Sequence, residues 1–210
     1  MILKTRDKLI EVARQLFANK GVEKTTMNDI AEASDKGRRT IYTYFKNKRE
    51  IYRAVVDKES MQMLSRLHEL SCRQLSPENK LISFIFLRFD AVKEIVMRNG
   101  SLRASFFRDV RAVDRVRRIT AEEESKILAR ILQEGVDKGV FKIKHVDETA
   151  KVMILSLQGL DVPFIRNNFE DFGIERLRLR EYIRNFILYG ISAENAPRGE
   201  INSLSNQLKI

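Results

Sequence analysis

Residues 25–51, with the sequence TTMNDIAEASDKGRRTIYTYFKNKREI, decide the fold of this chain. Thr26 precedes Asp29 by three residues, a spacing at which the threonine oxygen accepts a hydrogen bond from an amide of the first helical turn. The polar cluster at residues 34–37 ends in a glycine and predicts a tight turn. We therefore expect a short helix that starts after Thr26, a turn, and a second helix.

The second helix, from Arg38 onward, presents a basic and aromatic face. Ile41 and Phe45 recur one turn apart and define its apolar face. Between residues 36 and 49 the chain has six Lys or Arg and no Asp or Glu, so phosphate is the natural complement. Two short helices joined by a tight turn, with arginine and tyrosine on the second, are the layout of a helix-turn-helix DNA-binding unit.

These residues resemble the TetR family of tetracycline-repressor-like transcriptional regulators. The family's reading stretch runs approximately I-A-x-x-A-G-V-S-x-G-T-L-Y-x-Y-F-x-x-K-x-x-L. This chain follows it without gaps at Ile30, Ala31, Thr40, Ile41, Tyr42, Tyr44, Phe45, Lys48 and Ile51. An upstream family pattern, A-x-x-L-F-x-x-x-G-V-x-x-T-T, is matched at Ala13, Leu16, Phe17, Gly21, Val22, Thr25 and Thr26.

The turn departs from the family pattern, because Asp35-Lys36-Gly37 stands where the family has Gly-Val-Ser. We expect Asp35 to adopt an unusual backbone angle and Lys36 to leave the small core. Gly37 can cap the second helix almost as well as serine.

The resemblance implies an all-α fold of about nine helices. An N-terminal three-helix helix-turn-helix domain, residues 1–47, would precede an effector-binding and dimerisation domain, residues 48–192, and a loosely ordered tail, residues 193–210. It also implies a homodimer that binds a palindromic operator on double-stranded DNA. A small molecule of unknown identity would tilt the fourth helix, move the two heads apart and release the DNA.

Geometry and the resemblance together assign candidate DNA contacts. Arg38 and Arg39 lie where base edges are within reach, and Tyr42 and Thr43 add base contacts. Asn28 is a possible extra base contact from the preceding helix. The phosphate positions of the family correspond to Thr26, Thr40, Tyr44 and Lys48. For Tyr42 and Tyr44 the alternative is packing in the small core, and for Lys48 it is a solvated surface position.

Composition narrows the class of protein. Over 210 residues the formal net charge is +10, which points to a polyanionic partner. The single Cys72 excludes an internal disulfide, and two histidines far apart leave a metal site or cofactor unexpected. We see no run of about 18 apolar residues and no signal-peptide core, so we expect no membrane span and a cytoplasmic location.

Periodicity and capping signals predict the remaining helices. The first should span residues 5–20, with Thr5 as its cap and Gly21 as its stop, and the fourth should run from 47 or 48 to about 73. Pro77 at a first helical position opens the fifth, which ends at residues 99–100. Thr120 and Glu123 form a capping box that opens a helix stopped by the spaced glycines before residue 140.

Residues 147–167 and 175–190 predict two helices with apolar residues on more than one face. A helix that is apolar on two faces is buried on two sides, so the pair could form a four-helix dimer interface. Pro163 should kink the first of them or end its regular part. The arginine-rich residues 98–118 favour a solvated cationic face over an anion-binding pocket.

Two other function classes compete with an effector-controlled repressor. One is a ligand-independent architectural or chromosome-organising DNA-binding protein that uses the same head. The other is an enzyme, which we do not expect, because no paired carboxylates, nucleophile-base pair or phosphate-cradling glycine loop occurs at a recognisable spacing.

Overall fold

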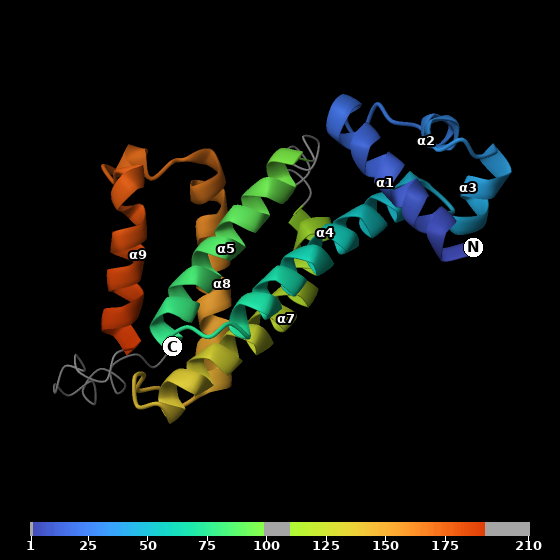
Figure 1. The fold of residues 1–210 in the computed structure, drawn as a ribbon. Coiled ribbons are helices and arrows are strands. Elements are labelled where there is room, and N and C mark those ends of the chain that lie inside the picture. Colours follow the sequence, from blue (N-terminus) through green and yellow to red (C-terminus); the bar gives the residue numbers. More distant parts are fainter. Residues whose placement is uncertain (1, 99–109, 192–210) are drawn as a thin grey trace, which may run out of the picture.

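The computed structural model describes residues 2–98 and 110–191 (Figure 1). Within these residues the chain forms eight α-helices, one short 3-10 helix and no β-strand, which confirms the all-α fold. The predicted tail, residues 193–210, lies outside the described residues. In Figure 1 a small head of short helices stands at one end of a larger helical body, and one long helix connects the two.

The head contains α1 (Ile2–Lys20), α2 (Met27–Ala33) and α3 (Arg38–Tyr44), and α4 (Lys48–Ser71) closes it. Its core is a compact apolar cluster to which all four helices contribute. The buried members are Leu9, Ile10, Ala13, Phe17, Ile30, Ala31, Ile41, Phe45, Ile51, Ala54 and Val55. Because three of these residues belong to α4, the fourth helix locks the head as expected from its small size.

The body is built from the rest of α4 with α5 (Pro77–Arg98), α7 (Val110–Asp137) and α8 (Val146–Arg166). After the 3-10 helix η1 (Glu170–Phe172), α9 (Arg176–Ile191) packs along α5. α7 contacts both α4 and α8, so it lies between the connecting helix and the C-terminal part of the chain. One large core cluster joins these helices, with Leu67, Phe84, Ile85, Leu128 and Leu132 fully buried in it.

Several predicted helix ends are confirmed. Gly21 follows α1 with a φ of 87°, and Gly139 follows α7 with a φ of 70°, both in the left-handed region that favours glycine. Asn47 caps α4, because its side-chain oxygen accepts a hydrogen bond from the Glu50 amide at 3.0 Å. Pro77 is the first residue of α5, as predicted.

Two predicted boundaries are wrong. α1 begins at Ile2, so Thr5 lies inside the helix and is not its cap. α7 runs unbroken from Val110 to Asp137, so the Thr-x-x-Glu pattern at Thr120 does not open a helix. The reason is that neither Gly nor Pro occurs between residues 110 and 134, and nothing local interrupts a helix that started earlier.

The spaced glycines also differ from expectation, and of the two effects predicted for Pro163, a kink or an end, the structure rules out the end. Gly135 lies inside α7, where it makes room for the Phe141 ring, and only Gly139 marks the end of the helix. Pro163 does not end α8, which continues to Arg166 and stops at Asn167 in a left-handed conformation with a φ of 61°. Proline lacks the N–H that would bond to the carbonyl four residues earlier, which is that of the exposed Gly159.

Candidate nucleic-acid interface

The start of α2 is fixed by a reciprocal cap. The Asp29 amide donates to Thr26 Oγ1 at 3.1 Å, and the Thr26 amide donates to Asp29 Oδ2 at 2.7 Å, which confirms the predicted cap. Lys20 Nζ at the end of α1 lies 2.8 Å from Asp29 Oδ2. The Lys20 ammonium and then the Thr26 amide lower the pKa of Asp29 from 3.8 to about 2. The cap and the ion pair therefore hold α2 against the end of α1.

The turn between α2 and α3 carries the unusual sequence Asp35-Lys36-Gly37. Asp35 has a φ of 55°, so the expected left-handed conformation is confirmed. Ser34 is buried, and its hydroxyl donates to the Ala31 carbonyl at 2.9 Å. Gly37 is the N-cap of α3, and its carbonyl accepts from the Thr40 amide at 2.9 Å. Lys36 is half-buried, and its amide closes the turn on the Ala31 carbonyl.

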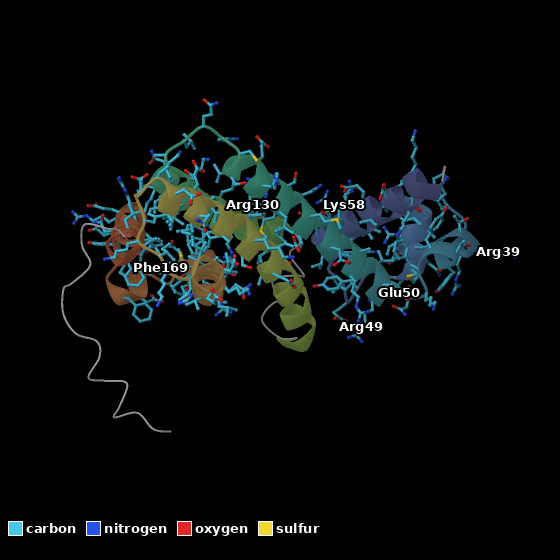
Figure 2. The ribbon with its side chains drawn as sticks, turned by 90° about the horizontal axis from the view of Figure 1, so that it is seen from below. Arg39, Arg49, Glu50, Lys58, Arg130 and Phe169 are labelled. Carbon is cyan, nitrogen blue, oxygen red and sulfur yellow. The ribbon has the colours of Figure 1, made fainter. Side chains whose placement is uncertain are left out.

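α3 divides into a buried face and an exposed face. Ile41 is fully buried in the head core, whereas Arg38, Arg39, Tyr42 and Thr43 are exposed. The Arg38 guanidinium lies 5.8 Å from the centroid of the Tyr42 ring, a cation–π distance. Figure 2 shows Arg39 at the end of the head farthest from the body. The exposed face therefore presents two arginines and an aromatic ring to the outside.

The two tyrosines of α3 lie in different surroundings. Tyr42 is 43% exposed and does not belong to the core, in contrast to the core alternative considered from the sequence. Tyr44 is half-buried and packs against the head core. Thr40 is half-buried beside it, and Asn28 is exposed on α2.

Lys48 has partners that the sequence did not suggest. Its Nζ donates to the carbonyls of Val22, at 2.7 Å, and Glu23, at 3.1 Å, in the loop after α1. The side chain is thus neither freely solvated nor dependent on a phosphate for a partner. It holds the first residue of α4 against the loop that follows α1.

Other basic side chains extend this surface, and one of them, Arg6, was missed in the sequence. The Arg6 guanidinium lies 5.3 Å from the centroid of the Phe45 ring, which places the start of α1 beside the end of α3. Lys46 and Arg49, which follow Phe45 in the chain, are exposed. The first turn of α1 carried a signal for this surface. Acidic residues are favoured there because cations oppose the helix dipole, yet this turn contains none.

Ion pairs connect the head to the long helix α4. Arg14 on α1 bonds to Glu11 and lies 4.0 Å from Glu59 Oε1 on α4, and Lys58 Nζ lies 3.6 Å from Glu11 Oε2. Glu59 is only 4% exposed, so solvent and salt weaken its contact with Arg14 less than they weaken an ordinary surface ion pair. The hydrogen bonds to Arg14 lower the pKa of Glu11. These ion pairs therefore connect α1 to α4.

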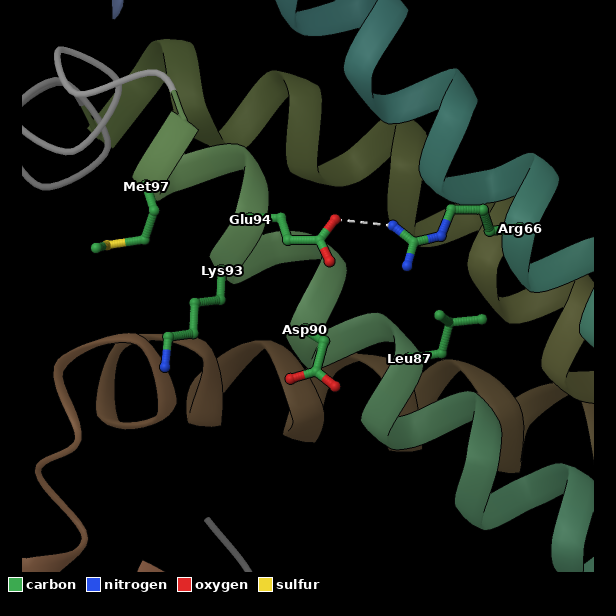
Figure 3. A pocket seen from close by; sticks show the side chains of 6 residues that line it. All are labelled: Arg66, Leu87, Asp90, Lys93, Glu94 and Met97. Carbon is green, nitrogen blue, oxygen red and sulfur yellow. Dashed lines mark hydrogen bonds and ion pairs between the residues drawn. The ribbon is translucent and has the colours of Figure 1, made fainter.

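A groove of about 370 Å³ lies on the body between α4 and α5. Figure 3 shows its six lining side chains, Arg66, Leu87, Asp90, Lys93, Glu94 and Met97, with Arg66 Nη1 bonded to Glu94 Oε2 at 3.0 Å. Four of the six are ionisable, namely Arg66, Asp90, Lys93 and Glu94. Among residues 2–98 and 110–191, no helix has the length and apolarity needed to cross a bilayer.

Comparisons with known proteins agree with this geometry. Residues 9–55 match the family described as "Bacterial regulatory proteins, tetR family". The chain is 28% identical over 142 residues to the HTH-type transcriptional repressor KstR2 of Mycolicibacterium smegmatis, with 65% of this chain and 67% of KstR2 covered. It is 32% identical over 102 residues to the probable acrEF/envCD operon repressor of Escherichia coli, a match that spans 48% of this chain and 46% of that repressor.

Solved structures extend the likeness over most of the chain. A transcriptional regulator from Cytophaga hutchinsonii superimposes with a TM-score of 0.72 at 23% identity and covers 89% of this chain and 97% of that one. A putative regulator from Saccharomonospora viridis, in complex with choline, gives a TM-score of 0.67 at 18% identity, with 90% and 98% covered. At these identities the likeness establishes the fold. With its capped helix-turn-helix and its basic exposed face, the chain carries at residues 9–55 the DNA-binding domain of the tetR family of bacterial regulatory proteins, and it is a DNA-binding transcriptional regulator.

Proposed function

We propose that the protein is a repressor that binds a palindromic operator as a homodimer and leaves it when a small molecule binds to the body. The observation that carries the proposal is the exposed face of α3, where Arg38, Arg39 and Tyr42 stand outside a fully packed head core. A rigid helix with two exposed arginines at its N-terminal end suits the major groove, where arginine pairs with guanine.

Within the head we propose two sets of DNA contacts. Arg38, Arg39, Tyr42 and Thr43 are exposed on α3 and would read base edges, with Asn28 of α2 as a further base contact. Phosphates would be held by a second set, made up of Thr26, Thr40, Tyr44 and Lys48. The half-buried positions of three of these, Thr40, Tyr44 and Lys48, suit contacts at the edge of the interface.

The dimer would form through α8 and α9. Val152 and Leu155 on α8 are each 63% exposed, and Phe186 on α9 is 80% exposed, which is unusual for large apolar side chains in a protein without a partner. Gly159 lies one turn beyond Leu155 on the same helix, and a Cβ built there meets nothing within 4 Å. A glycine in the middle of a helix lowers stability by about 1 kcal/mol relative to alanine. The missing side chain at Gly159 would, however, let the α8 helix of a second subunit approach closely.

Release by an effector would act through α4, which joins the head to the body. A relative of the same fold binds choline, which supports a small-molecule site in the body of this protein as well. The effector needs only a preference for one head separation, corresponding to a coupling of about 1 to 3 kcal/mol. The proposed role is regulatory and non-enzymatic.

Selection of bound duplexes from a random-sequence pool tests the proposal. We expect the full-length protein to enrich a palindrome with two half-sites about one helical turn apart. Enrichment of no sequence, or binding to all duplexes alike, would instead indicate the architectural alternative.

Two substitutions separate the proposed roles in the head. Arg38→Ala should weaken the selected operator more than random DNA, by about 1 to 3 kcal/mol for one lost base contact. Lys48→Ala should weaken both and lower the slope of log affinity against log salt by about one. An unchanged salt slope for Lys48→Ala would restrict its role to the carbonyl contacts seen in the structure.

A further inference from the structure

Arg88 is the most deeply buried cation among the described residues. Its side chain is 2% exposed, and it lies on α5 in the middle of the body. Nε donates to Glu124 Oε2 of α7 at 2.5 Å, while Nη1 and Nη2 donate to Asp161 Oδ1 and Oδ2 of α8 at 2.6 and 3.1 Å. Both carboxylates are also almost fully buried. One guanidinium therefore ties three helices together away from water.

Stability alone does not account for this triad. Removing charges from water costs several kcal/mol per ion, and apolar residues of similar volume often replace a buried triad without loss. Burial raises the pKa of Glu124 against the opposing effect of Arg88. Burial also favours deprotonation of Arg88, but Glu124 and Asp161 outweigh it and raise its pKa, so the guanidinium stays charged.

The geometry of the triad is restrictive. A planar guanidinium that bonds to both oxygens of one carboxylate accepts few alternative orientations of the two groups. A shift of α8 relative to α5 would break both bonds to Asp161, and a shift of α7 would break the bond to Glu124. An apolar core in the same place would tolerate small shifts, because packing of similar volume is not directional.

The three helices lie on the route between the proposed dimer face and the head. Asp161 belongs to α8, which carries Val152 and Leu155 on its exposed face. Glu124 belongs to α7, which packs along α4. At this contact Arg130 Nη1 of α7 lies 3.2 Å from His68 Nε2 of α4. In Figure 2, Arg130 lies on the body, Lys58 lies on α4 closer to the head, and Arg39 lies at the far end of the head.

We propose that Arg88 is a positioning residue for operator recognition, because it fixes the angle between α8 and the α7–α4 unit and thereby the separation of the two heads. This inference rests on the proposed dimeric repressor. The inference adds that a buried ionic contact, and not helix packing alone, sets the separation of the two heads.

The experiment compares operators that differ only in half-site spacing. The operator selected by the full-length protein is prepared with its spacer unchanged, and one or two base pairs longer or shorter, and affinities are measured by fluorescence anisotropy. The wild type should prefer one spacing by about 5- to 150-fold, the range of ordinary coupling between sites. The triple variant Arg88→Met/Glu124→Leu/Asp161→Leu should stay folded and dimeric, with that preference reduced at least about fivefold.

A matched control uses the other buried cation of α5. Lys80 Nζ bonds to Glu134 Oε2 at 2.6 Å and joins α5 to α7, and among the described residues neither side chain forms a hydrogen bond or ion pair with α8. The control variant Lys80→Met/Glu134→Gln should keep the wild-type spacing preference to within about twofold. A twofold change corresponds to about 0.4 kcal/mol, which is small beside a coupling of about 1 to 3 kcal/mol.

Each outcome decides the proposal. A folded triple variant with the wild-type spacing preference overturns it, and so does a control that loses the preference equally. Should the triple variant not fold, Asp161→Asn keeps the side-chain shape and one acceptor for Arg88, and its spacing preference decides in the same way. A wild type that selects an operator without any spacing preference overturns the role of Arg88 alone, whereas selection of no operator overturns the proposed repressor as well.

Discussion

Gly135 of α7 is a position where one added methyl group should destabilise the body. A Cβ built at Gly135 would lie 2.1 Å from Phe141 Cδ2, 2.5 Å from Cε2 and 2.8 Å from Cγ. Ordinary carbon contacts are about 3.5–4.0 Å, so the ring would have to move by more than about 1 Å. It has little room, because Phe141 is 4% exposed and its amide donates to the Gly135 carbonyl at 3.0 Å.

The magnitude follows from two opposing effects of Gly135→Ala. Alanine in place of a helical glycine normally adds up to about 1 kcal/mol to the free energy of unfolding. Overpacking a close-fitting core typically costs about 1–3 kcal/mol, and displacing a buried aromatic ring lies at the upper end. We therefore expect a net loss of about 1–2 kcal/mol.

Urea denaturation followed by far-UV circular dichroism, at one fixed protein concentration, measures this loss as a lower midpoint with an unchanged slope. The double variant Gly135→Ala/Phe141→Leu should lose less than the sum of the two single variants, because the shorter side chain leaves space for the methyl group. A Gly135→Ala variant as stable as the wild type, or additive losses in the double variant, would refute the close approach of Phe141.

The remaining predictions concern the head, two carboxylates and the proposed dimer. Ile41→Ala should lower the free energy of unfolding of the head by about 2–5 kcal/mol, seen as faster amide exchange in α1 to α3, because Ile41 is fully buried. The pKa of Asp29 is lowered from 3.8 to about 2, so its contribution is present above pH 3.8 and lost as the pH falls toward 2. Asp29→Asn should flatten that acid limb in a pH series of melting temperatures. Burial raises the pKa of Glu124 above 4.5, so its contribution is present below pH 4.5 and lost as the pH rises through the folded-state pKa. Glu124→Gln should remove this decline, and a decline that persists would assign it to another group. Phe186→Arg should shift sedimentation toward the monomer, whereas Met61→Arg, at a 70% exposed position on α4, should not.

Signals confined to one helical turn were predictable from the sequence. The cap at Thr26, the left-handed Asp35 and the first-turn proline at Pro77 depend on residues within three or four positions of each other. The apolar face of α3 was predictable for the same reason, since Ile41 and Phe45 are one turn apart and both are buried. These are the features on which the helix-turn-helix interpretation depended.

Contacts between distant parts of the chain were not predictable in this way. Thr120 shows the same local pattern as a true cap, yet α7 passes through it because the helix begins at Val110. Arg88 stands 36 residues from Glu124 and 73 from Asp161, so its partners could not be identified from spacing. The available hint was an arginine within an apolar run, since a buried arginine needs charged partners.

If Lys48 holds a DNA phosphate as proposed, its two carbonyl contacts have a consequence for the kinetics of the complex. A lysine side chain has about 2 kcal/mol of rotamer entropy to lose when it is immobilised, and here much of that loss occurs when the head folds. Two of the three ammonium protons are engaged by Val22 and Glu23, so the third has a defined direction. A phosphate oxygen that arrives along that direction has to immobilise little of the Lys48 side chain. The low entropic cost favours a long residence time of the DNA complex more than a fast first encounter.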